Sequence, residues 1–124
     1  MAPLPYASER LGRPPALLGF RTMRHAEAAG LLANAEVVVE PTLVTDLLRE
    51  RGRAHDVIAC GPEPMLRAVA RLAPRTQLAC EAPMACGYGA CYGCAVEVDG
   101  RLVRLCVEGP ILDGARVYAM SGRA

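Results

Sequence analysis

The sequence has 124 residues, of which 52% are hydrophobic and 22% charged, and its formal net charge is +1. This length allows one domain with at most a small appendage, and the composition is typical of a soluble globular protein. The near-neutral charge argues against a nucleic-acid partner. No apolar stretch approaches the roughly 18 residues that span a bilayer, and the N-terminus lacks a secretory signal. We therefore expect a cytoplasmic protein without a membrane segment.

Short apolar runs alternate with stretches of helical period up to residue 80, an order that predicts an α/β fold with a parallel sheet. Beyond residue 80 the chain is rich in glycine and cysteine. We therefore expect two domains, residues 1–80 and 81–124, the second a small β-hairpin module. The strands predicted for the first are Ala16–Phe20, Glu36–Val39, Asp56–Cys60 and Thr76–Cys80.

Three helices are predicted between these strands. The first covers Arg24–Leu32, the second follows Thr42 as N-cap and ends before Gly52, and the third begins at Pro62 and stops at Pro74. In the second and third, apolar residues share one face that should pack on the sheet. They are Leu43, Val44, Leu47 and Leu48 in one, and Met65, Leu66, Val69 and Leu72 in the other.

The C-terminal module shows short alternating runs separated by turn residues. The predicted strands are Ala95–Val98, Leu102–Val107 and Val117–Met120, with tight turns at Asp99–Gly100 and Asp113–Gly114.

Four cysteines of this module have the spacing of an iron–sulfur site. Cys86, Cys91 and Cys94 form C-x4-C-x2-C, and Cys106 follows after eleven residues. Three thiolates from a loop and a fourth from a strand supply a plant-type [2Fe–2S] cluster. Glycines at 87, 89 and 93 allow the loop to wrap closely, with its N–H groups turned toward sulfur.

Structural zinc is the rival interpretation, but zinc usually takes four cysteines as two short-spaced pairs, and free or disulfide-bonded thiols are a further alternative. Cys80 is expected to be a small buried hydrophobe at a strand end. His25 and His55 have no partner at a diagnostic spacing and are expected to be surface or capping residues.

The string Cys60–Met65 places a glycine between a strand and a helix. This is the carboxyl edge of the predicted parallel sheet, where nucleotides bind in open α/β folds. Neither G-x-G-x-x-G nor a P-loop is present in the sequence.

Together these motifs resemble the iron–sulfur electron-transfer subunit of NAD-dependent, type B dihydroorotate dehydrogenases, relatives of the ferredoxin reductases. The resemblance covers nearly all of this chain but only the C-terminal part of such a subunit. It rests on Cys86–Cys94 with Cys106 and Gly109–Pro110, on Cys60–Met65, and more weakly on Leu18–Arg21 and Val44–Leu48.

The resemblance implies that residues 1–80 form a partial nicotinamide-binding domain that lacks its first strand, and that residues 81–124 bind the cluster. Cys86, Cys91, Cys94 and Cys106 are then the cluster ligands. Cys60, Gly61 and Pro62 should lie near the nicotinamide and flavin, and Gly19 and Arg21 near the adenosine side of the nucleotide.

The family's full subunit holds FAD as well as the cluster. It passes electrons taken from dihydroorotate by an FMN-bearing catalytic subunit to NAD in pyrimidine biosynthesis, within a heterotetramer. This chain opens at Met1–Leu4, inside the family's Gly-rich turn and without a flavin-binding β-barrel. We therefore expect Met1 to be a truncated or mis-assigned start, and the chain alone not to bind FAD or oxidise NADH. The missing strand should leave a sheet edge unpaired, so the fragment should be unstable or sticky.

Two other functions stay open. The chain could be the small subunit of another flavin and iron–sulfur enzyme, such as a hydrogenase or a glutamate synthase-like reductase. Alternatively, it could be a zinc-stabilised interaction module without redox activity.

Overall fold

The computed structural model describes residues 3–32, 34–52 and 56–118. The chain forms two compact units, Met1–Gly52 and Arg53–Ala124. Parallel strand pairing with connecting helices occurs in both units, so the predicted α/β class is confirmed. No helix in the described ranges is long and apolar enough to cross a membrane.

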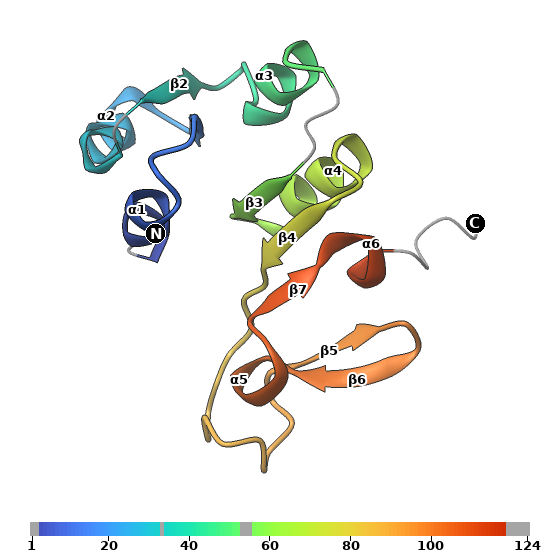
Figure 1. Ribbon diagram of the computed structural model, residues 1–124. Coiled ribbons are helices and arrows are strands. Elements are labelled where there is room, and N and C mark those ends of the chain that lie inside the picture. The colour runs from blue at the N-terminus through green and yellow to red at the C-terminus, as the bar shows by residue number, and fades with distance from the viewer. Residues whose placement is uncertain (1–2, 33, 53–55, 119–124) are drawn as a thin grey trace. The chain divides into compact units, whose positions relative to one another are not determined.

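The first unit is built on two parallel strands (Figure 1). They pair in register from Ala16 opposite Ala35 to Phe20 opposite Val39. Gly19 lets a helix approach this pair, because a Cβ there would lie 3.1 Å from the Cβ of Val44. In chain order the elements are α1 (Pro3–Arg10), β1 (Ala16–Phe20), α2 (Met23–Ala26), the 3₁₀ helix η1 (Glu27–Leu31), β2 (Ala35–Val39) and α3 (Val44–Glu50).

Both strands predicted for this unit are confirmed, but two helix details were wrong. The predicted helix over residues 24–32 is divided into α2 and η1, and Gly30 explains why a regular α-helix is disfavoured there. Leu43, not Thr42, is the N-cap of α3. Its N–H donates to Oδ2 of Asp46 at 3.0 Å, so a carboxylate in the first turn accepts the N–H of the N-cap residue.

The second unit contains a three-stranded sheet in the order β3-β4-β7 and a separate hairpin of β5 and β6 (Figure 1). β3 and β4 are parallel, whereas β7 runs antiparallel to β4. The elements are β3 (Val57–Cys60), α4 (Glu63–Leu72), β4 (Thr76–Ala79), β5 (Ala95–Val98), β6 (Arg101–Arg104), α5 (Leu105–Glu108), β7 (Ile111–Asp113) and α6 (Gly114–Val117).

The predicted strands β3, β4 and β5 and the predicted helix α4 are confirmed within a residue or two. The turn predicted at Asp99–Gly100 is also confirmed. Both residues have positive φ, 52° and 75°, as a two-residue turn of type I′ requires. Val98 and Arg101 pair on either side of it.

Two predictions for the C-terminal module were wrong. The strand predicted over Leu102–Val107 ends at Arg104, and its second half lies in α5, whose N-cap residue Arg104 donates its backbone N–H to Glu108. Asp113 and Gly114 do not form a hairpin turn, because the Asp113 carboxylate accepts the Ala115 N–H at 2.9 Å and caps α6. Val117 therefore ends a helix with Tyr118 as its C-cap, and residues 119–120 of the predicted strand lie outside the described residues.

The largest fully buried side chains of the second unit lie before, within and after the cysteine loop along the chain. Leu78 of β4 and Leu105 of α5 are 0% exposed, and Cys94 is 2% exposed. The domain boundary predicted after residue 80 stays a prediction.

Candidate metal centre

Three of the four candidate ligands lie on the irregular segment between β4 and β5, and the fourth lies on α5. Cys86 is half-buried, Cys91 exposed and Cys94 buried. Cys106, half-buried, stands on a helical turn directly after the strand that pairs with β5. The hairpin thereby returns the chain to the loop. This is why Cys106, twelve positions after Cys94 in the sequence, lies beside it.

The four sulfurs are arranged as two pairs. In the first pair, the backbone N–H of Cys91 faces the sulfur of Cys86, and the N–H of Tyr88, the Cys91 thiol and the Ala90 N–H add to it. These donors lower the pKa of Cys86 to about 6, which favours the thiolate form that binds metal.

The second pair is formed by Cys94 and Cys106. The backbone N–H of Cys106 and then its thiol lower the pKa of Cys94. The same interaction with Cys94, together with burial, raises the pKa of Cys106. The carbonyl oxygen of Cys94 also accepts the Leu105 N–H at 3.2 Å, which fixes α5 against the end of the loop.

Left-handed backbone conformations shape the loop between the pairs. Gly87 and Gly89 have φ of 73° and 87°, and Tyr92 has φ of 56°. A Cβ on Gly89 would lie 2.8 Å from Cγ2 of Val107, so glycine is required there for both conformation and space.

The donor set fits an iron–sulfur cluster better than a single metal ion. Within the described ranges, no three His, Cys, Asp or Glu side chains gather closely enough to hold one metal ion. A tetrahedral zinc site needs four donors around one point, whereas a two-iron cluster needs four thiolates spread over two irons. Two thiol pairs, each with a sulfur of lowered pKa, meet the second requirement.

Charged residues around Cys106 complete the site, although the cysteine spacing does not identify them. Arg104 and Glu108 flank Cys106 and form an ion pair at 3.1 Å. The sequence does carry a signal for them, an arginine and a glutamate four residues apart on either side of a ligand cysteine.

The remaining cysteines and histidines agree with their predicted roles or lie outside the described residues. Cys80 is 8% exposed. Burial, and then the charge of Glu63, raise its pKa, so it is a buried thiol. His25 is exposed, and its Nδ1 lies 3.0 Å from Oγ1 of Thr22. His55 lies outside the described residues.

The predicted nucleotide contacts belong to two different units of the chain. In the second unit, Cys60 ends β3 and Pro62 is the N-cap of α4. Between them, a Cβ on Gly61 would lie 2.5 Å from Cε of Met65, so a larger residue there would require the flexible end of the Met65 side chain to move. In the first unit, Gly19 lies in β1 and exposed Arg21 pairs with Glu40 at 3.8 Å. The role of all five residues in nucleotide binding stays a prediction.

Comparison with known proteins addresses the family directly. Residues 81–118 match the family model of the iron–sulfur cluster binding domain of dihydroorotate dehydrogenase B. A 72-residue stretch is 40% identical to a dihydroorotate dehydrogenase B electron transfer subunit homolog of Aquifex aeolicus. An 80-residue stretch is 40% identical to the electron transfer subunit of Bacillus caldolyticus.

The resemblance to type B dihydroorotate dehydrogenase electron-transfer subunits is confirmed. The two alignments cover 56% and 60% of this chain but only 29% and 31% of the relatives. The chain thus spans about a third of the length of the dihydroorotate dehydrogenase B subunits that it matches. The family match covers all four cysteines and supports an iron–sulfur cluster.

A solved structure extends the likeness to the fold of the whole chain. The structure of an NADH-dependent reduced ferredoxin-NADP oxidoreductase, described in connection with flavin-based electron bifurcation, has a TM-score of 0.77 and 26% identity. The similarity covers 93% of this chain and 48% of that chain. This likeness confirms the predicted ferredoxin-reductase-like fold.

Proposed function

We propose that residues 81–118 hold a [2Fe–2S] cluster on Cys86, Cys91, Cys94 and Cys106, and that the chain transfers electrons through it. Cys86 and Cys91 would bind one iron, and Cys94 and Cys106 the other. The observation that carries this proposal is the division of the four thiols into two pairs, each with a sulfur whose pKa is lowered.

The chain's own residues prepare the site for such a group. Backbone N–H groups lower the pKa of Cys86, which reduces the cost of removing its proton when iron binds. Buried Cys94 and Leu105 keep water away from one side of the site. When bound, the cluster supplies a one-electron redox centre, and hydrogen bonds to its sulfurs influence its potential.

The electron path that we propose follows the relatives' names. Electrons from dihydroorotate would reach the centre from an FMN-bearing catalytic subunit and pass by way of FAD to NAD, in pyrimidine biosynthesis. The 40% identity to dihydroorotate dehydrogenase B electron transfer subunits supports this path. FAD would be bound by the parts of the relatives' subunits that lie outside their alignment with this chain.

Replacement of single cysteines tests the ligand set. Cys86→Ser, Cys91→Ser, Cys94→Ser and Cys106→Ser should each reduce the iron and acid-labile sulfide retained after anaerobic reconstitution. Cys60→Ser is the matched control and should keep both. A full iron and sulfide content in any of the four variants would remove that residue from the ligand set.

A second assay tests the electron path. The reconstituted chain is mixed anaerobically with an FMN-bearing dihydroorotate dehydrogenase subunit, and dihydroorotate is added. Bleaching of the visible absorption that depends on both components supports the path. If dihydroorotate leaves the colour unchanged while dithionite bleaches it, the chain holds a cluster but this subunit is not its partner.

The small subunit of another flavin and iron–sulfur oxidoreductase is the second candidate. The likeness to an NADH-dependent ferredoxin-NADP oxidoreductase over 93% of the chain favours it. Reduction of the cluster by such an enzyme's partner subunit, but not in the dihydroorotate assay, would select this candidate.

A further inference from the structure

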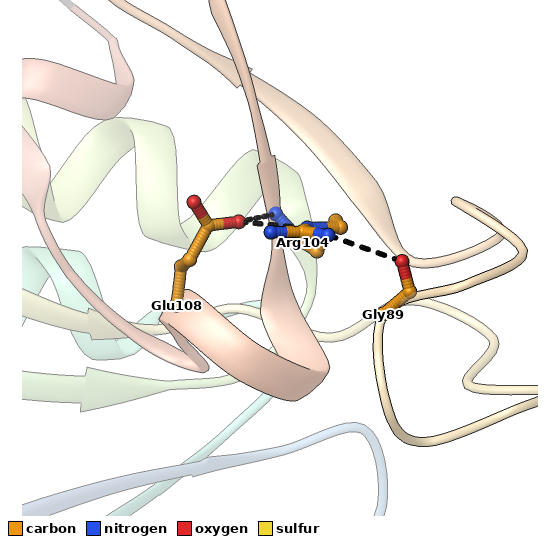
Figure 2. A network of polar contacts seen from close by, with 3 residues as sticks. All are labelled: Gly89, Arg104 and Glu108. Carbon is orange, nitrogen blue, oxygen red and sulfur yellow. Dashed lines mark hydrogen bonds and ion pairs between the residues drawn. The ribbon is translucent and has the colours of Figure 1, made fainter.

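Arg104 connects the cysteine loop to the segment that carries Cys106, as Figure 2 shows. Its side chain is 29% exposed and lies between two acceptors. Nε donates to Oε2 of Glu108 at 3.1 Å, and Nη1 donates to the carbonyl oxygen of Gly89 at 3.2 Å. The guanidinium also lies over the ring of Tyr92, 5.2 Å from its centroid. One side chain thus holds two points of the loop.

Glu108 fixes the direction in which Arg104 extends. Besides the side-chain contact, Oε2 of Glu108 accepts the backbone N–H of Arg104 at 2.9 Å. The carboxylate thereby binds both ends of the same arginine, and its own pKa is lowered by these two contacts. This leaves the outer edge of the guanidinium free to reach the loop (Figure 2).

The contact with Gly89 determines where the next N–H points. In a planar trans peptide the C=O of one residue and the N–H of the next point in opposite directions. When Arg104 holds the Gly89 carbonyl, the N–H of Ala90 must therefore point the other way. That N–H is among the groups that face the sulfur of Cys86. The N–H of Gly89 itself faces the sulfur of Cys106.

The aromatic contact acts on a second part of the loop. Tyr92 has a φ of 56°, a conformation that a bulky residue adopts only when its surroundings hold it there. Stacking of a guanidinium on the ring provides such support. Tyr92 lies between Cys91 and Cys94, so this support acts on the segment that joins the two thiol pairs.

We propose that Arg104 is a positioning residue of the iron–sulfur centre, which holds the Gly89–Ala90 peptide so that its N–H, that of Ala90, donates to the sulfur of Cys86. This inference rests on the proposed function. Donors to sulfur stabilise the more negative, reduced state, so loss of this orientation shifts the reduction potential to more negative values. The positive charge of Arg104 acts in the same direction, and the experiment has to separate the two contributions.

Three variants make this separation. Arg104→Lys keeps the charge but loses the planar fork that reaches Glu108 and Gly89 together. Arg104→Gln loses both the fork and the charge. Arg116→Gln is the matched control, because Arg116 of α6 forms a comparable pair at 2.7 Å, but with Asp99 of the β5–β6 hairpin.

The first readout is the reduction potential of the reconstituted chain in an anaerobic dye titration. We expect a more negative potential in Arg104→Lys, a further shift in Arg104→Gln, and the wild-type value in Arg116→Gln. A wild-type potential in Arg104→Lys would overturn the proposal, because charge alone would then explain the effect of Arg104.

The second readout needs no cluster. In the metal-free chain, amide hydrogen exchange of Ala90, followed by NMR, should be about fivefold faster in Arg104→Lys than in wild type, as loss of one hydrogen bond implies. Unchanged exchange would overturn the proposed positioning. If wild type takes up no cluster, the proposed function fails, and this exchange measurement still decides whether Arg104 holds the loop.

Discussion

Truncation of Leu105 should release the cluster by loosening α5. The side chain is 0% exposed and immediately precedes Cys106, and its Cδ2 would lie 3.0 Å from a Cβ on Gly109. Leu105→Ala removes about three buried carbons at about 0.8 kcal/mol each, and the cavity left behind adds to this loss. We therefore expect the free energy of unfolding to fall by about 3–4 kcal/mol, which lowers the melting temperature by on the order of 10 °C.

Leu78→Ala is the matched control for this variant. Leu78 is also 0% exposed, but it lies in β4 against Gly114, away from α5. Both variants should melt early by circular dichroism in the metal-free state. After reconstitution, only Leu105→Ala should lose its visible absorption rapidly when a strong iron chelator is added below the melting temperature. Equal rates of colour loss in the two variants would refute a specific role of Leu105 in holding Cys106.

Further predictions concern the loop and α3. Gly87→Ala should lower the free energy of unfolding by about 1 kcal/mol, because of its positive φ alone. Gly89→Ala should lower it more and also reduce iron retention, because its Cβ would overlap Val107 as well. Urea unfolding and iron analysis of both variants check this, and equal losses of stability and iron would contradict it. The Leu43 N–H, and then the Arg49 side chain, lower the pKa of Asp46. The contribution of Asp46 to stability is therefore fully present above its ordinary pKa of 3.8. It disappears as the pH falls through the lower pKa of the folded state. Asp46→Asn should therefore lower the urea midpoint at pH 7 but no longer at a pH below both values, and a difference that persists in acid would contradict the assignment.

Local patterns predicted those parts of the fold that depend on nearby residues. The four strands of the parallel pairs are short apolar runs between polar residues, and α4 has a proline at its start and an apolar stripe. The turn at Asp99–Gly100 needs two residues with positive φ, which this pair of residues supplies.

The elements that could not be predicted depend on distant partners. β7 has three residues and exists because it pairs with β4, more than thirty residues earlier in the chain. The alternating pattern of β6 continues into α5, and only the Glu108 carboxylate on the backbone of Arg104 marks where the strand ends. The Asp113–Gly114 pair has the composition of a turn, but its aspartate caps a helix instead.

The candidate site was also predictable only in part from the sequence. The cysteine spacing predicts the donor residues, since ligands of a compact centre must be close in sequence or on adjoining elements. Spacing does not reveal that the thiols form two pairs, because the pairing depends on the hairpin that brings Cys106 to Cys94. The role of Arg104 depends on a contact with Gly89 fifteen residues away, which no local pattern contains.

Metal analysis of the chain purified without oxygen tests the central claim most directly. Iron, acid-labile sulfide and zinc are measured on the same sample as the visible absorption spectrum. A [2Fe–2S] cluster on the four cysteines predicts about two irons and two sulfides per chain, with a colour that dithionite bleaches. A colourless chain that holds one zinc and no sulfide would contradict the account.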